Sequence, residues 1–263
     1  MTPKISVVMA VYNGGDFLKK SITSILTQTY SNFEFIIIND GSTDNSQSVI
    51  NLFSEEDDRI IVIHNIKNQG LTKSLNSGCR LSRGDYIARQ DADDISLKTR
   101  LEEQINVMSQ REAVVLLGSR AYEINDKHKV ISKYFNENEI SKRIKLQNPF
   151  IHSSIMIKAT IFKKLGFYNE IFSTSQDYDA WIRLSQVGSI LMLNKPLVNY
   201  YINPNSISNK TKYKQCFNSI KIRWHHVDYI GYKFFLMGSI YRIIMIFVPR
   251  FIIRIKQKTI GRR

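Results

Sequence analysis

The chain is poor in cysteine: its 263 residues include only Cys79 and Cys216, which lie far apart in the sequence. Two distant cysteines form neither a disulfide framework nor the paired spacing of a zinc site, so we expect both to be packing residues in a reducing compartment. Residues 1–4 lead directly into an apolar run and lack the pattern of a signal peptide. We therefore expect a cytoplasmic protein.

Two common phosphate-binding motifs are also absent. The sequence contains no G-x-G-x-x-G and no G-x-x-x-x-G-K-[ST], so it gives no support for a dinucleotide cofactor or a P-loop nucleotide hydrolase. It also contains no internal repeat or low-complexity segment. The hydrophobic share of 43% and the charged share of 23% are those of an ordinary globular protein.

Acidic residues are nearly missing from the end of the chain, although the whole chain carries a net charge of +14. Residues 210–263 are rich in Lys and Arg and contain one acid, Asp228. A basic surface can bind nucleic acid, an anionic membrane or a phosphorylated substrate. The apolar run at 234–248 is interrupted by Arg242 and is shorter than the ~20 residues of a spanning helix.

From this pattern we expect residues 211–263 to form a basic amphipathic helical tail that lies on the anionic cytoplasmic leaflet. The alternative is a helix that packs on the protein and keeps its basic edges in solvent.

Strand and helix patterns alternate through the first 110 residues. Apolar runs typical of strands are followed by polar turns and then by helical periodicity. The predicted strands are 5–11, 33–38, 60–64 and 86–89, and the predicted helices cover about 15–29, 43–53 and 71–81. Such alternation predicts an α/β fold with a parallel sheet flanked by helices.

Polar and glycine residues follow each predicted strand, at Tyr12-Asn13, Asp40-Gly41, 68–70 and 91–94. Ligands bind at the carboxyl ends of the strands in such sheets, so these groups should meet at one rim. Each group taken alone is an ordinary turn.

The last of these groups contains three carboxylates, Asp91, Asp93 and Asp94. Alternation places Asp91 and Asp93 on the same side of an extended segment. Close carboxylates repel each other unless a cation lies between them, and two such ligands suit Mg²⁺ or Mn²⁺ bound to substrate phosphates. The alternative is a solvated acidic turn, or a helix cap provided by Asp94 or Ser96.

Six short runs occur in a characteristic order: 6–13, 24–30, 37–44, 68–71, 84–88 and 91–94. In this order and spacing they resemble family 2 glycosyltransferases, and the resemblance covers roughly residues 4–200. It implies a GT-A fold, with a Rossmann-like, mostly parallel central sheet and here a C-terminal helical extension. It also implies a nucleotide-sugar donor and an inverting mechanism that depends on a divalent metal.

The resemblance also assigns the donor side of the site. Asp91 and Asp93 are similar to the family's DXD pair, so Asp93 is expected to bind Mn²⁺ or Mg²⁺. Asp91 is expected to share the metal or to reach the ribose, and Asp94 to be structural. The carboxylate of Asp40 suits an N–H on a uracil-like base, which favours UDP. The expected nucleotide-sugar contacts are Ala10, Val11, Tyr12, Asn13, Asp40, Asn68, Gly70, Asp91, Ala92 and Asp93.

Two polar residues of the second half also match family segments. A strand is predicted over 148–158, after two others within 114–135, and it contains His152. The resemblance places His152 near donor phosphates, metal or acceptor, although a lone histidine in a strand is more often structural.

A helix is predicted to begin near Gln176, and Asp177 and Asp179 in its first turn are explained most simply by the helix dipole. The segment also resembles the family's catalytic helix, with Gln176 in place of the usual acid. On that basis we expect Asp177 to be the base that deprotonates the acceptor hydroxyl.

One further motif is similar but incomplete. Arg223-Trp224 resembles the Q-x-x-R-W motif of processive family members, but Ile220 stands at the glutamine position. We therefore expect transfer of a single sugar. The expected organisation is a catalytic domain at 1–210, with a nucleotide-sugar half at 1–110 and an acceptor half at 111–210, followed by the tail at 211–263. Residues 203–210 are expected to be an acceptor loop or a linker.

These expectations combine into one hypothesis. The chain is predicted to be a metal-dependent hexosyl- or N-acetylhexosaminyltransferase, peripheral on the inner face of the cell membrane and without a nucleic-acid partner. It would transfer one sugar from a UDP-sugar to a lipid-linked glycan in bacterial surface-polysaccharide synthesis.

Two alternatives stay open. A sugar nucleotidyltransferase is one, although residues 11–16 lack the basic part of its glycine-rich loop. The other is a non-catalytic protein that uses the same scaffold to bind a membrane or nucleic acid.

Overall fold

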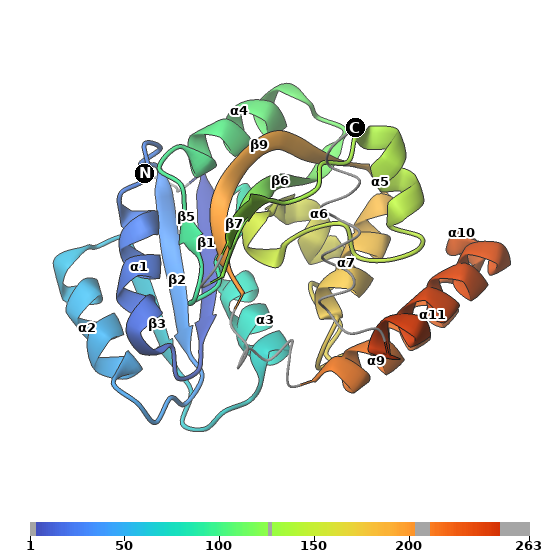
Figure 1. The fold of residues 1–263 in the computed structure, drawn as a ribbon. Coiled ribbons are helices and arrows are strands. Elements are labelled where there is room, and N and C mark those ends of the chain that lie inside the picture. The colour runs from blue at the N-terminus through green and yellow to red at the C-terminus, as the bar shows by residue number, and fades with distance from the viewer. Residues whose placement is uncertain (1–3, 126–127, 203–210, 248–263) are drawn as a thin grey trace.

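The fold is built around one mixed sheet with helices on both faces (Figure 1). The structure is a computed structural model and describes residues 4–125, 128–202 and 211–247, with side chains described up to residue 244. The predicted loop at 203–210 and the end of the predicted tail lie outside these ranges.

The first half contains the predicted parallel strands. Four strands lie in the order β3-β2-β1-β4, and all three neighbouring pairs are parallel. They are β1 (Ile5–Val11), β2 (Phe33–Asn39), β3 (Ile60–His64) and β4 (Tyr86–Arg89). The connecting elements are η1 (Gly15–Phe17), α1 (Leu18–Leu26), α2 (Ser46–Glu56) and α3 (Leu71–Leu81). The predicted α/β alternation is confirmed, and α1 ends three residues earlier than predicted.

The second half extends this sheet with mixed pairing. β8 (Met156–Lys158) lies antiparallel to β4 and to β6 (Val114–Asn125), which pairs in parallel with β9 (Ser189–Tyr201). The short strands β5 (Ile95–Ser96) and β7 (His128–Ile131) pair antiparallel with β9 and β6. Strands β1 to β4 therefore form one side of a larger mixed sheet.

Two predictions for this half are wrong. The strand predicted over 148–158 begins only at Met156, because His152–Ser154 form a 3₁₀ turn, η2, in which the Ser154 amide donates to the Ile151 carbonyl at 3.0 Å. The two strands predicted within 114–135 are one strand to Asn125 followed by β7. The register between β6 and β9 shifts near Arg120 instead of breaking the strand.

Each face of the sheet carries its own buried core. On β1, Val7 and Met9 pack with apolar residues of α1, α2 and α4 (Arg100–Gln110), whereas Val8 belongs to the core of the other face. That second core includes Leu75 of α3 and Trp181 of α7 (Gln176–Ser185). It also includes residues of α5 (Glu137–Arg143) and α6 (Ala159–Lys164). Because β2 is buried along its whole length, the parallel strands are covered on both sides.

Three helices end the described chain: α9 (Lys212–His225), α10 (Val227–Ile230) and α11 (Tyr232–Phe247). We call them the C-terminal helices. Figure 1 shows α9 and α11 side by side, next to α7 and away from the parallel strands. No helix within the described ranges is long and apolar enough to cross a bilayer.

A buried ion pair fastens the C-terminal helices to α7. The carboxylate of Asp179, fully buried, accepts from Arg183 Nε at 2.8 Å and from His226 Nε2 at 2.9 Å. Burial opposes ionisation of this carboxyl group, but the hydrogen bonds from His226 and Arg183 and their charges lower its pKa below the usual value.

Replacing Asp179 with Ala should therefore lower the free energy of unfolding by about 3–5 kcal/mol, because two partly buried donors lose their acceptor. The matched control is Glu103→Ala, which removes an exposed ion pair with Lys195 and should change stability by no more than about 1 kcal/mol. Since the Asp179 pKa is depressed, its contribution is present above the unfolded pKa and is lost as pH falls through the folded pKa. Urea unfolding at pH 7 measures the difference, and equal losses in the two variants would contradict the anchoring role.

Candidate active site

The loops after β1, β2 and β3 are bonded to one another at the carboxyl rim of the parallel strands. Asn13, which has a φ of +53°, donates its amide to Ser42 Oγ at 3.0 Å, and its side-chain oxygen accepts from the Thr43 amide at 2.8 Å. Tyr12 beside it is 48% exposed. The polar groups predicted to meet after these strands thus lie on loops that contact each other directly.

Asp40 joins the loop after β2 to the loop after β3. One of its carboxylate oxygens accepts from Asn65 Nδ2 at 2.7 Å and from the Gln69 amide at 2.9 Å. The other accepts from the Gly70 amide at 2.9 Å. The sequence predicted that the Asp40 carboxylate accepts a hydrogen bond from the nucleotide base. It did not predict that the same carboxylate also binds the loop at 65–70.

Close backbone approach at Gly41 makes this arrangement possible. Gly41 has a φ of +70°, and a Cβ there would lie 2.7 Å from the Asn68 amide nitrogen. Gly15 also has a positive φ, +56°, but a Cβ there would meet nothing within 4 Å. A side chain at Gly15 would meet only the cost of a left-handed backbone, whereas a side chain at Gly41 would also collide with the 67–68 backbone.

The acidic group after β4 contains carboxylates in two different environments. Asp91 and Asp93 are partly exposed, and Asp91 is paired with the buried guanidinium of Arg89. Asp94 is fully buried, where it accepts from the Tyr201 amide at 3.1 Å and from the Ser153 hydroxyl. Asp94 therefore has a structural environment, and Asp91 and Asp93 are the carboxylates that a ligand can reach.

Burial and the charge of neighbouring carboxylates disfavour the charged forms of Asp93 and Asp94. The pKa of Asp93 is raised to about 6, first by burial and then by the charge of Asp91. The pKa of Asp94 is raised well above its usual value by the same two causes. A cation between Asp91 and Asp93 would remove this repulsion.

Buried polar residues that the sequence interpretation did not single out hold the acidic turn in place. Gln90 Nε2 donates to the Asp94 carbonyl at 2.8 Å, and Gln90 Oε1 accepts from Arg100 Nη1 at 3.0 Å. Burial lowers the pKa of the Arg100 guanidinium to about 9. No local pattern identifies these partners, because Arg100 meets the turn only through the fold.

The donor set fits a hard divalent cation. No group of three or more His, Cys, Asp or Glu residues that could hold a metal occurs within the described ranges. Mg²⁺ typically takes one or two protein carboxylates and completes its coordination with water and substrate phosphates. Asp91 and Asp93 match that kind of open site, and not a closed structural one.

Asp177 lies at the start of α7, after Ser175, whose φ is +61°. Its carboxylate accepts from Asn148 Nδ2 at 2.6 Å and from the Tyr178 amide at 2.8 Å. Burial raises the pKa of Asp177, while these hydrogen bonds and the charge of Arg242 oppose the rise. A partly exposed carboxylate with a raised pKa has the properties of a general base.

His152 lies in the 3₁₀ turn and packs against aromatic residues. Its Nε2 is 2.8 Å from the Tyr168 hydroxyl, and its ring centroid is 5.8 Å from that of Trp181. Burial lowers the pKa of the imidazole well below its usual value, with a smaller effect from Arg89, so the ring is neutral near pH 7. These contacts support the structural interpretation of His152 and leave its ligand role a proposal.

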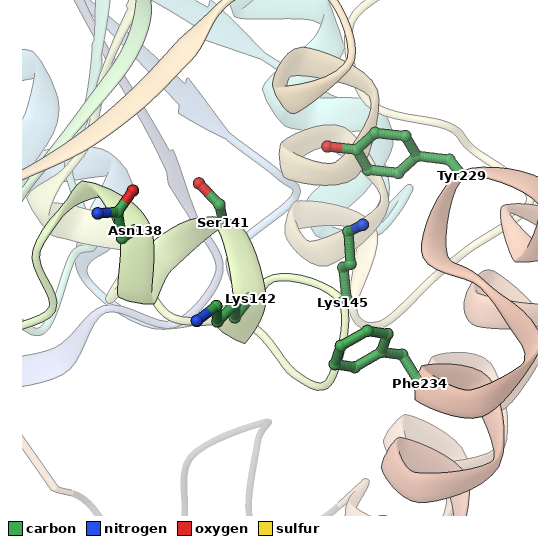
Figure 2. A pocket seen from close by; sticks show the side chains of 6 residues that line it. All are labelled: Asn138, Ser141, Lys142, Lys145, Tyr229 and Phe234. Atoms are coloured by element: carbon green, nitrogen blue, oxygen red, sulfur yellow. The ribbon is translucent and has the colours of Figure 1, made fainter.

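A pocket of about 400 Å³ lies elsewhere, where α5 and the residues after it meet the C-terminal helices (Figure 2). Lys145 points toward Tyr229 in this view, and its ammonium is 5.3 Å from the centre of that ring. The lining residues are Asn138, Ser141, Lys142, Lys145, Tyr229 and Phe234. None of the predicted site residues is among them.

Replacing Gly41 with Ala should destabilise the protein more than the same replacement at Gly15. Both variants place a side chain at positive φ, which costs about 1–2 kcal/mol. Only Gly41→Ala also forces the 67–70 loop away, which should add about 1–3 kcal/mol. Thermal and urea unfolding of the two variants measure the difference, and equal stabilities would show that the close approach of the two loops is unimportant.

Comparisons with known proteins agree with this geometry. Residues 6–166 match the family described as Glycosyl transferase family 2. The uncharacterized glycosyltransferase MJ1057 of Methanocaldococcus jannaschii is 33% identical, over 96% of this chain and 92% of that protein. The O-antigen biosynthesis glycosyltransferase WbnJ of Escherichia coli is 35% identical, over 81% of this chain and 85% of that protein.

Solved structures show the same fold. The S. aureus TarS 1–349 structure in complex with UDP-GlcNAc has a TM-score of 0.71 at 16% identity, over 83% of this chain and 65% of that one. The mannosyltransferase PcManGT of Pyrobaculum calidifontis, in complex with GDP-Man and Mn²⁺, has a TM-score of 0.68 at 12% identity. That match covers 91% of this chain and 70% of the other. The chain has the GT-A fold and belongs to glycosyl transferase family 2.

Proposed function

We propose that this glycosyltransferase moves one sugar from a UDP-sugar to a hydroxyl of a lipid-linked glycan, with inversion, during bacterial surface-polysaccharide synthesis. The observation that carries the proposal is Asp177, a partly exposed carboxylate of raised pKa at the start of α7, on a different element from the Asp91–Asp93 pair. A displacement reaction needs two acidic groups, because one assists the leaving diphosphate and the other receives the acceptor's proton. The WbnJ relative, described as an O-antigen biosynthesis enzyme, supports the choice of pathway class.

The nucleotide would bind on the rim formed by the loops after β1, β2 and β3. Asp40 uses its two oxygens to accept three hydrogen bonds from residues 65–70. A carboxylate offers about four acceptor sites, so one remains for an N–H of the base. Tyr12, half exposed beside this group, offers a face on which the base can stack. The remaining proposed contacts are Ala10, Val11, Asn13, Asn68, Gly70 and Ala92.

Asp93, with Asp91, would hold Mn²⁺ or Mg²⁺. A divalent cation bound there would neutralise charge on the diphosphate. The similarity to PcManGT, whose structure contains Mn²⁺, supports a metal of this kind. The chain's own contribution is to hold two carboxylates close together against their mutual repulsion, through the buried contacts of Gln90 and Arg100.

Asp177 would receive the proton of the acceptor hydroxyl. As that O–H bond breaks, the acceptor oxygen forms a bond to the anomeric carbon and the bond from this carbon to the diphosphate oxygen breaks. Asn148 holds the carboxylate in place at 2.6 Å. His152, if it reaches the acceptor or a phosphate, would do so as a neutral ring.

The acceptor is proposed to be lipid-linked because of the C-terminal helices. Large apolar side chains on α9 and α11 are exposed, and residues 210–263 are strongly basic. Apolar side chains combined with basic residues are typical of helices that lie on an anionic membrane surface. This supports a peripheral location on the inner face of the cell membrane.

Replacing Asp177 with Asn should lower kcat by roughly 10²–10⁴-fold, the usual contribution of a general base. Binding of UDP, measured by calorimetry, should stay within about twofold. In the wild type, kcat should fall as pH drops through the pKa of Asp177, which partial burial raises above its ordinary value. Asp58→Asn is the control, because Asp58 is exposed before β3, at the opposite edge of the sheet. A variant at position 177 that turns over like the wild type would exclude this base.

Replacing Asp93 with Ala should abolish the dependence of turnover and of UDP binding on added Mn²⁺. Asp94→Asn is the informative comparison, since Asp94 is buried and bonded to Tyr201 and Ser153. The Asp94→Asn variant should have a lower melting temperature than the wild type but keep its response to Mn²⁺. Each variant is titrated with Mn²⁺ with and without UDP, and the melting temperature is measured at each point. This measurement distinguishes a loss of stability from a loss of metal binding. An unchanged metal response in the Asp93 variant would remove this residue as a ligand.

A further inference from the structure

Helix α11 is largely apolar and exposes many of its large side chains. The face that packs inward carries Phe234 and Phe235 near its start and then Gly238, Ser239 and Arg242. A Cβ on Gly238 would lie 2.8 Å from the Leu146 carbonyl, and Ser239 is only 8% exposed. The face that points outward carries large apolar side chains that are 42–56% exposed: Leu236, Met237, Ile240, Tyr241, Ile243 and Ile244.

Such an arrangement places apolar side chains in solvent where helices of soluble domains place polar ones. A helix face with several large exposed apolar side chains suits a contact with a membrane or a partner. Lys233, exposed near the beginning of α11, and the basic composition of 210–263 favour an anionic bilayer as the medium on that side. The outward face of α11 therefore indicates which side of the protein meets the membrane.

The inward face of the same helix carries a guanidinium that forms no ion pair with a described carboxylate. Arg242 Nη2 donates to Ser219 Oγ at 3.3 Å, and its buried Nε has no hydrogen-bond partner among the described residues. Arg223 of α9 is fully buried and donates to the Leu146 carbonyl at 3.3 Å, and its Nε and Nη2 have no partner within the same ranges. Among the ion pairs of the described residues, none includes either arginine.

The two arginines also repel each other. Burial lowers the pKa of Arg223, and the charge of Arg242 lowers it further. A guanidinium does not lose its proton in a protein, and a buried charge is normally paired. Two neighbouring cations with unused donors are therefore a place where a bound anion would be stabilised.

This basic pair lies at the candidate base. Ser219 Oγ, which binds Arg242, is 3.5 Å from Ser175 Oγ, just before α7 and two residues before Asp177. The charge of Arg242 acts on Asp177, where it opposes the effect of burial on the pKa. The donor side of the site, in contrast, lies at the ends of β1 to β4.

We propose that Arg242, next to the fixed charge of Arg223, binds a phosphate of the lipid-linked acceptor and places the acceptor sugar at Asp177. This rests on the proposed function and specifies its acceptor. Arg forms charge-assisted, often bidentate hydrogen bonds with phosphate, and the Arg242 side chain is partly exposed. The diphosphate leaving group of the donor could form the same hydrogen bonds. The position of Arg242 on the helix proposed to face the membrane favours the acceptor.

The arrangement also limits the length of the acceptor. The outward and inward faces of α11 are separated by one helix diameter, about 10–12 Å. The phosphate must therefore be bound, and the new bond formed, close to the bilayer surface. This fits a lipid phosphate or diphosphate that carries one or a few sugars, so a preceding reaction must attach the first sugar to the lipid phosphate.

Binding of farnesyl diphosphate to the full chain, measured by calorimetry without donor, tests the proposal. The wild type should bind it more tightly than farnesol and more tightly than inorganic pyrophosphate. Arg242→Gln should weaken the binding by roughly tenfold or more, as expected for lost charge-assisted hydrogen bonds, and Arg242→Lys by less. Lys233→Gln removes the same charge from the exposed face of α11 and should change binding by no more than about twofold.

UDP binding distinguishes the two sources of phosphate and should be unchanged in Arg242→Gln. Equal losses for UDP and farnesyl diphosphate would overturn the proposal in favour of the donor. Unchanged farnesyl diphosphate binding in a folded Arg242→Gln variant would also overturn it. Since these measurements need no sugar transfer, a failure of Asp177 as the base would leave their outcome unaffected.

Discussion

The buried guanidinium of Arg100 is the interaction on which the rest of the site depends. It donates to Gln90 and Ser96, to the Arg89 carbonyl at the end of β4, and to the Ile155 carbonyl just before β8. These bonds join the last parallel strand to the mixed half of the sheet. Because these hydrogen bonds are all buried, losing the guanidinium would leave several buried polar groups unsatisfied. The acidic turn can hold its carboxylates close together because this support is rigid.

Environment, and not residue type, distinguishes Asp91, Asp93, Asp94 and Asp177 from one another. Asp94 is enclosed by hydrogen bonds from Ser153 and Tyr201, whereas Asp91 and Asp93 keep an accessible side. Asp177 lies far from them in sequence. Its carboxylate accepts a hydrogen bond from Asn148 and is affected by the charge of Arg242. Burial raises the pKa of Asp93, Asp94 and Asp177, and the partners of each carboxylate oppose this effect to different extents.

Local patterns predicted the parallel strands and the helix at 71–81 because apolar periodicity and turn residues act over a few positions. They did not predict β9, whose run is interrupted by Asn194-Lys195-Pro196, or the turn at His152–Ser154, which bends to bring Ser153 to Asp94. The contacts of Asp40, Arg100 and Asn148 also escaped prediction. Each joins residues at least 10 positions apart, so they depend on the fold and not on local sequence.

The bond between the Tyr201 amide and Asp94 joins residues 107 positions apart. Strand β9 must therefore be in place before the acidic turn acquires all of its hydrogen bonds. During synthesis from the N-terminus, the acidic turn is made about 100 residues before the strand that completes it. The acidic turn can therefore acquire its full set of hydrogen bonds only after most of the protein has been made.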